Sequence, residues 1–402
     1  MAILAVNAGS SSLKFSVHPV VRDDVQAPAL TGNIEGLEPG GSPQMRWTHQ
    51  GRQQLRSLSA GQSAAKSDAF SRALGELRSL FTEELRLSPP VAVAHRVVHG
   101  GVYFNQSVIV TSEVLIALEK LNSLAPLHQP HNLAGIRAFA EAFAGVPQIA
   151  CFDTAFHASA PALHQQFALP ASMHREGVRR YGFHGLSYQY IMGVLTERSE
   201  RARGRVLMAH LGNGASLCAA SAGTSIASTM GFSALDGLMM GTRSGALDPG
   251  VLLYLLEQGW DHRRIEKLLY KESGLLGVSG LSADMRALRA SSDPASRDAI
   301  ALFTHRIVRE SGAMIACLRG LDVIAFSGGI GEHDAELRKQ VCAELAWLEV
   351  RIDYQKNRAA TGEAAMPVHQ PDSRVEIWVV PTDEGRVAAR EAAALIRGRQ
   401  DQ

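Results

Sequence analysis

Short apolar segments of strand length recur along the chain, separated by longer segments with helical periodicity. Strands are predicted at Ile3–Val6, Val91–Ala94, Gln148–Phe152, Val206–Leu211, Val323–Phe326 and Val375–Val380. Apolar residues spaced three and four positions apart predict helices over 64–87, 133–143, 299–321 and 385–397. Strands that alternate with helices are typical of an α/β layered protein, in which sites form at the loops after the strands.

Two further segments predict local secondary structure. Residues 22–63 are rich in Gly, Pro, Ser and Gln, and they predict a small, irregular β-region. Asp248 followed by Pro249 is typical of a helix N-cap with proline in the first turn, which predicts a helix through Glu257.

Three Gly-rich segments follow predicted strands. They are NAGSSS (7–12) with Lys14 beyond it, HLGNGAS (210–216) and SGGIGEH (327–333). Glycine lets a backbone approach an anion closely, and a turn of N–H groups forms an anion nest. Simple tight turns are the alternative. The first two segments also echo each other about half the chain apart, which suggests two similar domains that each present a phosphate-binding turn.

The familiar nucleotide fingerprints are missing from these segments. No Gly-Lys pair occurs in the chain, so a P-loop of the Walker type is excluded. Leu217 stands where a dinucleotide-binding loop would have its third glycine. Phosphate binding is therefore expected from a different kind of loop.

Composition and charge narrow the function classes. The 402 residues suggest two or three domains, and 40 Lys and Arg against 39 Asp and Glu leave no basic excess for nucleic acid. Cys151, Cys218, Cys317 and Cys342 form no CxxC pair, which favours unpaired thiols in a reducing compartment. No signal peptide and no apolar run of membrane-spanning length is present. We therefore expect a soluble, cytoplasmic protein without membrane or nucleic-acid partners.

Charged and polar side chains gather in short motifs next to glycines and strand ends. Arg96 lies in HRVVHGG, His184 in RYGFHG and Arg243 in GLMMGTRSG, and arginine binds carboxylate and phosphate in a bidentate manner. Asp153 follows a predicted strand, and so does Glu384 in PTDEG. The carboxylates of PTDEG, Asp383 and Glu384, suit Mg²⁺ and its water ligands, and a helix N-cap is the alternative for both segments. The spacing of His95 and His99 suits zinc on a helix, but the strand-like context argues against it.

Taken together, these motifs resemble the acetate kinase family over essentially the whole chain. The resemblance rests on NAGSSSLKF, AHRVVHGG, PLH (126–128), FDTAFH, RYGFHG, HLGNGAS, MMGTRSG, FSGGIGEH and TDEG, in that order. It implies the fold shared with sugar kinases, actin and chaperone ATPases, an α/β architecture of duplicated actin-like (ribonuclease H-like) domains with a nucleotide cleft between them. The expected domains are residues 1–155, joined by the C-terminal helix 386–402, and residues 156–385.

Motif by motif, the resemblance also implies the site. Catalytic roles fall to Asp153, His184 and Arg243. Acetate binding falls to Arg96, Val98, Leu127 and Phe183, and metal binding to Asn7 and Glu384. The nucleotide would be bound by Ser10, Ser12, Lys14, His210, Leu211, Gly212, Asn213, Gly214, Asp284, Met285, Arg286, Gly329, Ile330, Gly331, Glu332 and His333.

The activity implied by the resemblance is reversible in-line transfer of the γ-phosphoryl group of ATP to acetate, which gives acetyl phosphate and ADP. Mg²⁺, with Mn²⁺ as its substitute, and a homodimer are implied in the same way. Because a carboxylic acid with a pKa of about 4.3 is ionised at neutral pH, acetate needs no general base. Asp153 is therefore expected to organise Mg²⁺, water or Arg243.

Two alternatives stay open. A propionate or butyrate kinase would use the same scaffold, and here Ala234 stands where the family has a pocket proline, while Ala246 replaces a family carboxylate. An actin- or chaperone-like ATPase that gates partner binding is the second alternative. That class needs no carboxylate clamp, whereas Arg96 and Arg243 would provide one, so the kinase interpretation is favoured.

Overall fold

The structure is a computed structural model that describes residues 1–9, 11–22, 24–38, 40–58, 66–85, 87, 89–126 and 128–400. Ser10 and Leu127, both expected in the site, lie outside the described residues. The chain forms two compact units. Unit 1 comprises Met1–Ala155 and Asp383–Gln402, and unit 2 comprises Phe156–Thr382.

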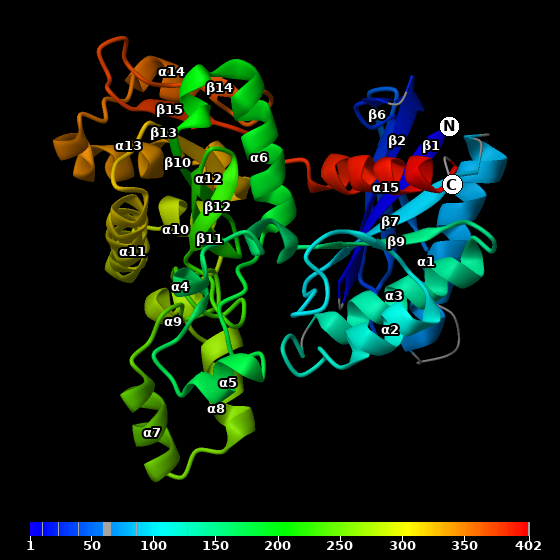
Figure 1. Cartoon of the computed structure of the whole chain (residues 1–402), viewed down its shortest axis with the longest axis horizontal. Helices are drawn as coiled ribbons and strands as arrows, with labels where there is room; N and C mark the ends of the chain where they lie inside the picture. Colours follow the sequence, from blue (N-terminus) through cyan, green and yellow to red (C-terminus); the bar gives the residue numbers. More distant parts are fainter. Residues whose placement is uncertain are drawn as a thin grey trace. The chain divides into compact units, whose positions relative to one another are not determined.

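Unit 1 is built on a mixed nine-stranded sheet (Figure 1). Its strands, in spatial order, are β6 (Arg52–Ser57), β5 (Gln44–His49), β4 (Leu30–Glu35), β2 (Ser12–Val21), β1 (Ala2–Ala8), β7 (Ala92–Val97), β9 (Gln148–Phe152) and β8 (Val108–Ile109), with β3 (Asp24–Val25) paired to β2. The strands β1, β7 and β9 run parallel, and the other pairings are antiparallel.

Helices cover both faces of this sheet. The helices are α1 (Lys66–Ser79), which continues as a π-helical turn at Leu80–Glu84, α2 (Ser112–Glu119), α3 (Gln129–Ala142) and α15 (Glu384–Gln400). Along β1, Leu4 and Val6 join a core with α1 and α3 residues such as Leu74 and Phe139. Alternate side chains of a strand point to opposite faces, and the opposite face of β1 and β7 packs against α15.

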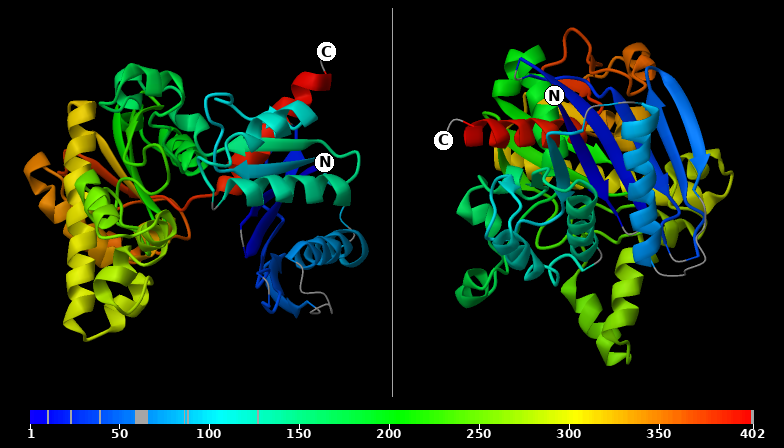
Figure 2. Two further views of the ribbon diagram at one scale, coloured as in Figure 1. Left: turned by 90° about the horizontal axis from the view of Figure 1, so that it is seen from below. Right: turned by 90° about the vertical axis from the view of Figure 1, so that its right-hand side faces the viewer.

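Unit 2 has a six-stranded sheet with the order β12 (Thr224–Ser228), β11 (Ala215–Ser221), β10 (Arg205–Leu211), β13 (Val323–Ser327), β15 (Glu376–Val379) and β14 (Met366–Pro367). Helix α6 (Gly185–Arg198) packs on one face through Tyr188, Ile191 and Leu195. The long helix α11 (Pro294–Leu318) packs against β10, β11 and β12. The remaining helices are α4 (Ala162–Gln165), α5 (Ala171–Arg175), α7 (Pro249–Glu257), α8 (His262–Lys271), α9 (Gly274–Ser279), α10 (Met285–Ala290), α12 (Gly328–His333), α13 (Ala335–Glu344) and α14 (Tyr354–Ala359) (Figure 2).

The two sheets share one topology. In each unit, an antiparallel hairpin is flanked on one side by a further antiparallel strand and on the other by two parallel strands: β4-β2-β1-β7-β9 in unit 1 and β12-β11-β10-β13-β15 in unit 2. In the first hairpin β1 ends at Ala8 and β2 begins at Ser12, and in the second β10 ends at Leu211 and β11 begins at Ala215, so the two segments whose echo suggested a duplication occupy equivalent places. The expected duplicated α/β fold is confirmed.

Most predicted elements are confirmed, and two differ. All six predicted strands are present, and Asp248 caps α7 by accepting a hydrogen bond from the Gly250 N–H. The region expected to be irregular contains β4, β5 and β6 in a regular antiparallel array. The segment SGGIGEH was expected to be a loop, but Gly328–His333 forms the short helix α12. Within the described part of the chain, no helix is long and apolar enough to cross a membrane.

Candidate active site

In unit 1, the parallel strands bring three predicted site residues to one edge of the sheet. Asn7 lies near the end of β1, Arg96 near the end of β7, and Asp153 directly after β9. The register aligns Val6 with His95 and Arg96 with Cys151, and the Asp153 N–H donates to the carbonyl of Val97 at 3.0 Å. The carboxyl ends of parallel strands are where α/β proteins place their sites.

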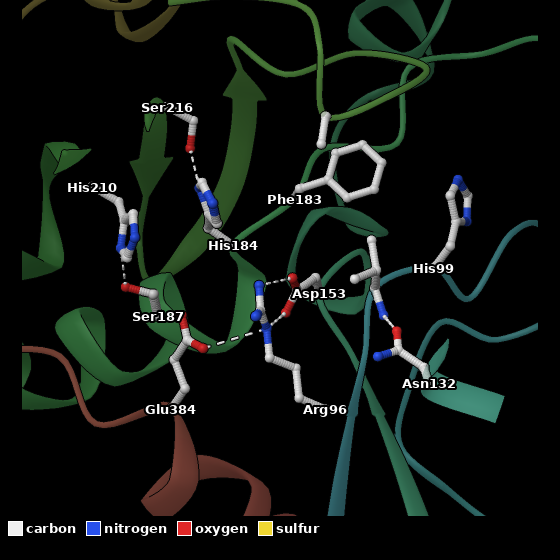
Figure 3. Close-up of polar contacts among 12 residues, drawn as sticks. Arg96, His99, Asn132, Asp153, Phe183, His184, Ser187, His210, Ser216 and Glu384 are labelled. Carbon is white, nitrogen blue, oxygen red and sulfur yellow. Dashed lines mark hydrogen bonds and ion pairs between the residues drawn. The ribbon is translucent and has the colours of Figure 1, made fainter. Parts of the chain in front are cut away.

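Arg96 lies between two carboxylates (Figure 3). Its Nε and Nη2 donate to the two carboxylate oxygens of Asp153 at 3.0 and 2.6 Å, a bidentate pair. A carboxylate oxygen of Glu384 lies 3.3 Å from the same Nε. The group therefore carries two negative charges against one positive charge.

Burial sets the electrostatics of this group. The Asp153 side chain is 2% exposed, whereas those of Arg96 and Glu384 are each 22% exposed. Burial raises the pKa of Asp153 above its ordinary value, and the Arg96 guanidinium opposes that rise. Burial also disfavours the charged form of Arg96, but the charges of Asp153 and Glu384 outweigh it and raise the pKa of Arg96. Arg96 is consequently cationic at any working pH.

Glu384 reaches this position because α15 begins very close to β2. Asp383 caps the helix by accepting a hydrogen bond from the Arg386 N–H at 2.9 Å. A side chain at Gly385 would begin 2.5 Å from the hydroxyl oxygen of Ser16, so only glycine allows this approach. The first turn of α15 thus holds Glu384 beside Arg96.

Two amide side chains of α3 fix the segment after Arg96. Asn132 accepts from the Val98 N–H at 3.0 Å (Figure 3 shows this contact at the Asn132 oxygen). It also donates to the carbonyl of Ala8 at 2.9 Å, which joins the ends of β7 and β1. Gln129 bonds both the N–H and the carbonyl of His99. Val98, expected in the acyl pocket, is 8% exposed, and its backbone is held rigidly by these contacts.

In unit 2, three predicted motifs meet at the end of β10. The Gly241 N–H of MMGTRSG donates to the carbonyl of Asn213 at 3.0 Å, so the turn that carries Arg243 is joined to the GNGAS turn. A side chain at Gly241 would overlap the amide oxygen of Asn213. A side chain at Gly328, where α12 begins, would lie 2.7 Å from the carbonyl of Leu211. The small residues of these motifs are required for this close approach.

The two histidines of this region stack on each other. The rings of His184 and His210 lie 4.3 Å apart at an interplanar angle of 29°. His184 precedes α6 in a left-handed conformation with φ of 59°, and its Nδ1 lies 2.8 Å from the hydroxyl of Ser216. The Nδ1 of His210 lies 2.8 Å from the hydroxyl of Ser187 (Figure 3).

Backbone contacts fix the residues around these histidines. Nη1 of Arg243 donates to the carbonyl of Ala234 at 2.9 Å. His157 is buried, and burial lowers its pKa to about 4, so its ring is neutral. Its Nε2 donates to the carbonyl of Phe183 at 2.9 Å, and its Nδ1 faces the hydroxyl of Ser225. The residue before His184 is thereby held in place, and Phe183 itself is 2% exposed.

The remaining residues expected to bind nucleotide differ in their surroundings. Asp284 caps α10 and pairs with Arg286, whose side chain is 90% exposed. Glu332 accepts hydrogen bonds from the N–H groups of Gly328 at 2.8 Å and Thr382 at 3.3 Å, so its carboxylate is engaged in holding the start of α12. In unit 1, Lys14 is exposed and lies opposite Asn7 in the β1–β2 hairpin.

Oxygen atoms of unit 1 could hold a metal ion. Among the described residues, no group of three or more His, Cys, Asp and Glu is arranged to hold a metal. Mg²⁺, however, is commonly bound through one or two carboxylates together with substrate phosphates and water. The excess negative charge at Asp153 and Glu384 and the amide of Asn7 fit this mode of binding.

A model of the acetokinase family matches residues 2–390. The chain belongs to the acetokinase family. The acetate kinase of Rhodopseudomonas palustris is 48% identical over 400 residues, covering 98% of each chain. The crystal structure of Porphyromonas gingivalis acetate kinase matches with a TM-score of 0.86 at 33% identity, covering 98% of this chain and 99% of that one. A propionate kinase structure from Francisella tularensis matches with a TM-score of 0.86 at 34% identity, covering 97% and 98%. The duplicated actin-like fold expected from the sequence is thereby confirmed.

Sequence reasoning within this acetokinase missed several residues that shape the site. The pairing of Asp153 with Arg96 was not anticipated, because Asp153 was connected with Mg²⁺, water or Arg243. Asn132 and Gln129 gave no signal, since their contacts join segments about 30 or more positions apart in sequence. Arg338 was also missed. It is fully buried and donates to the carbonyls of Gly331 and Glu332, the last turn of α12.

The unequal burial of the two carboxylates leads to a stability prediction. Asp153→Asn should lower the free energy of unfolding by roughly 2–4 kcal/mol, because it removes one partner of a buried ion pair. Glu384→Gln should cost less than about 1 kcal/mol, since that carboxylate is partly hydrated. Urea unfolding measures both, with the exposed Asp24→Asn as the control. Equal losses for the two variants would contradict this assignment of the buried pair.

Proposed function

We propose that this protein is an acetate kinase, which transfers the γ-phosphoryl group of ATP reversibly to acetate and yields acetyl phosphate and ADP. The observation that carries the proposal is the pairing of Arg96 with Asp153 through one edge of its guanidinium. Nη1 of Arg96 has no partner among the described residues, so the N–H groups on the edge formed by Nη1 and Nη2 can donate to a second carboxylate. Acetate would bind there in a bidentate manner.

The groups of unit 2 are suited to an anionic nucleotide and to the transferring phosphoryl group. The N–H groups of the GNGAS turn can bind phosphate oxygens, as glycine-rich turns do. His184 and Arg243 project next to that turn: the Nε2 of His184 and the Nη1 of Arg243 lie 3.4 and 3.9 Å from the point where a side chain at Gly214 would begin. Phosphoryl transfer depends chiefly on positioning and on charge stabilisation, which such donors supply.

Mg²⁺ would be held by Glu384 and Asn7, and when bound it would neutralise negative charge on the phosphates. Asp153 would act by holding Arg96 in a fixed orientation. No proton has to be removed from acetate, because its carboxyl group is already ionised at neutral pH. A buried aspartate that is committed to an arginine is therefore compatible with the proposed reaction.

Acetate is favoured over propionate because relatives that are 48% and 43% identical are named acetate kinases, whereas the propionate kinase match is 34% identical. Val98, a branched residue, would limit the length of the acyl chain. Ala234, in place of the family's proline, leaves additional space, while its carbonyl holds Arg243. We expect modest discrimination, since an apolar pocket separates one methylene by only about 10–200-fold.

A homodimer is part of the proposal. Helix α7 exposes Leu253, Tyr254 and Leu256 at 62%, 58% and 52% of their surface, and Leu247 just before it at 43%. A row of apolar side chains exposed on one helix is typical of a surface that a second protein covers. A second copy of this chain would bury it.

The activity is tested by trapping acetyl phosphate with hydroxylamine in the presence of Mg²⁺ and ATP. The wild-type protein should form the hydroxamate from acetate. Arg96→Ala should raise the KM for acetate at least about tenfold, as expected for a charge-assisted bidentate pair, and change the KM for ATP by less than about threefold. The exposed Arg137→Ala is the matched control. Equal effects of Arg96→Ala on both substrates would refute the carboxylate role.

The acyl pocket is tested by the ratio of kcat/KM for acetate and propionate. Val98→Ala should lower this ratio, because it adds room for one methylene, worth about 0.8 kcal/mol when accommodated. Ala234→Pro should raise it by removing space. The exposed Val102→Ala serves as the control. A ratio that stays unchanged in both pocket variants would show that these residues do not contact the acyl chain.

The dimer is tested by light scattering. The wild-type protein should have about twice the 43.2 kDa mass of the chain. Leu253→Asp should shift the population toward monomer, because a charge would be buried without a partner. Leu163→Asp, at a leucine that is 81% exposed outside α7, should leave the mass unchanged. A monomeric wild-type protein would disprove the assembly.

A further inference from the structure

The hydroxyl groups of Tyr188 and Ser216 form a chain that ends on His184. The Tyr188 hydroxyl lies 2.5 Å from the Ser216 hydroxyl, which lies 2.8 Å from Nδ1 of His184 (Figure 3 for the second contact). Tyr188 and Ser216 are both fully buried, and Tyr188 comes from α6 while Ser216 comes from β11. Among the described residues these are the two polar side-chain contacts of the Ser216 hydroxyl.

The direction of the hydrogen bonds along this chain depends on which groups carry a proton that they must donate. Burial raises the pKa of Tyr188 well above 10, so its hydroxyl keeps a proton that must be donated. Among the described side chains, the oxygen within hydrogen-bonding distance of that hydroxyl is Oγ of Ser216, at 2.5 Å. The acceptor for Tyr188 is therefore the Ser216 oxygen, and Ser216 in turn donates its own proton to Nδ1 of His184.

Neighbouring charges oppose an alternative in which His184 acts as a cation. His210 stacks on its ring at 4.3 Å, and Arg243 points to the same place beside Gly214. The group of α6 that shares the Ser216 hydroxyl with His184 is Tyr188, which is neutral. A second positive charge next to Arg243 would be repelled in a partly buried setting. To donate a hydrogen bond at neutral pH, the His184 ring must therefore carry its single proton on Nε2.

We propose that Tyr188 and Ser216 are positioning residues that hold neutral His184 in the Nε2–H tautomer, with that N–H aimed at the transferring phosphoryl group. This inference rests on the proposed function for the identity of the acceptor. The structure supplies the rest: the chain of hydroxyls, its direction, and the position of Nε2 beside Gly214 and Arg243. His184 thereby donates to an anion without needing to become charged.

The tautomer can be read directly by ¹⁵N NMR of protein labelled at histidine, recorded at about pH 8, where a histidine with an ordinary pKa near 6.5 is neutral. His184→Gln identifies the signal of His184. The expected result is a proton on Nε2 and a bare Nδ1 in the wild-type protein. In Tyr188→Phe and Ser216→Ala this preference should weaken to a mixture of tautomers. A wild-type ring that is protonated on Nδ1 would overturn the proposal.

Kinetics provide the second measurement. Ser216→Ala and Tyr188→Phe should lower kcat about tenfold, the usual effect of one net hydrogen bond, with less than about threefold change in the KM for acetate or ATP. Tyr190→Phe, on the same helix, is the matched control.

The two measurements separate the possible failures. Lowered kcat with an unchanged His184 tautomer would show that Tyr188 and Ser216 act only on folding or packing, and would overturn the proposal. An unchanged kcat together with an unchanged His184 tautomer in both variants would also overturn the proposal. If the wild-type protein forms no acetyl hydroxamate, the proposed function fails, while the NMR spectrum still reports whether the hydroxyl chain sets the tautomer.

Discussion

Two carboxylates share one arginine in unit 1, and the chemistry of the site depends on that imbalance. Arg96 is bound on one edge by Asp153 and approached by Glu384, so the group is negative by one charge before any substrate arrives. Acetate adds a further negative charge, and the phosphates of ATP add several. Since the group is largely buried, water screens this repulsion poorly. In the proposed site a cation at Glu384 would relieve this repulsion, so that metal binding and acetate binding would favour each other on electrostatic grounds.

The fold explains how these charged side chains are brought together. Parallel strands end together, so Arg96 and Asp153 come from neighbouring strands and meet without long loops. The same arrangement recurs in unit 2, where the hairpin turn after β10 is bonded to the Arg243 turn through Gly241 and Asn213. One supersecondary unit thus serves two purposes. In unit 1 it places an ion cluster, and in unit 2 it places backbone donors, a stacked histidine pair and an arginine.

The sequence predicted six strands (β1, β7, β9, β10, β13 and β15), five helices (α1, α3, α7, α11 and α15) and the motif residues, because periodicity and glycine content are local properties of the chain. It did not predict which side chains pair. Asp153 lies 57 positions from Arg96, and Ser216 lies 28 positions from Tyr188. Their contacts depend on strand order and register, which no local pattern encodes. The SGGIGEH segment was assigned to a loop because of its glycines, yet it is helical. The buried Arg338 donates to the carbonyls at the end of that helix, so a tertiary contact overrides the local propensity.

Arg96 and Arg338 show why an arginine's partners indicate its role better than its burial does. Arg338 is fully buried, and burial lowers its pKa to about 10. Its N–H groups donate to carbonyl groups and to the Asn357 side chain. With five hydrogen bonds satisfied in this way, it is committed to holding α12 and the segment around Asn357 together. Arg96 keeps an edge without a partner among the described residues and lies beside excess negative charge. An arginine whose hydrogen bonds are complete stabilises the structure around it, whereas one held on a single edge still has N–H groups to donate to a carboxylate, which is the role proposed for Arg96.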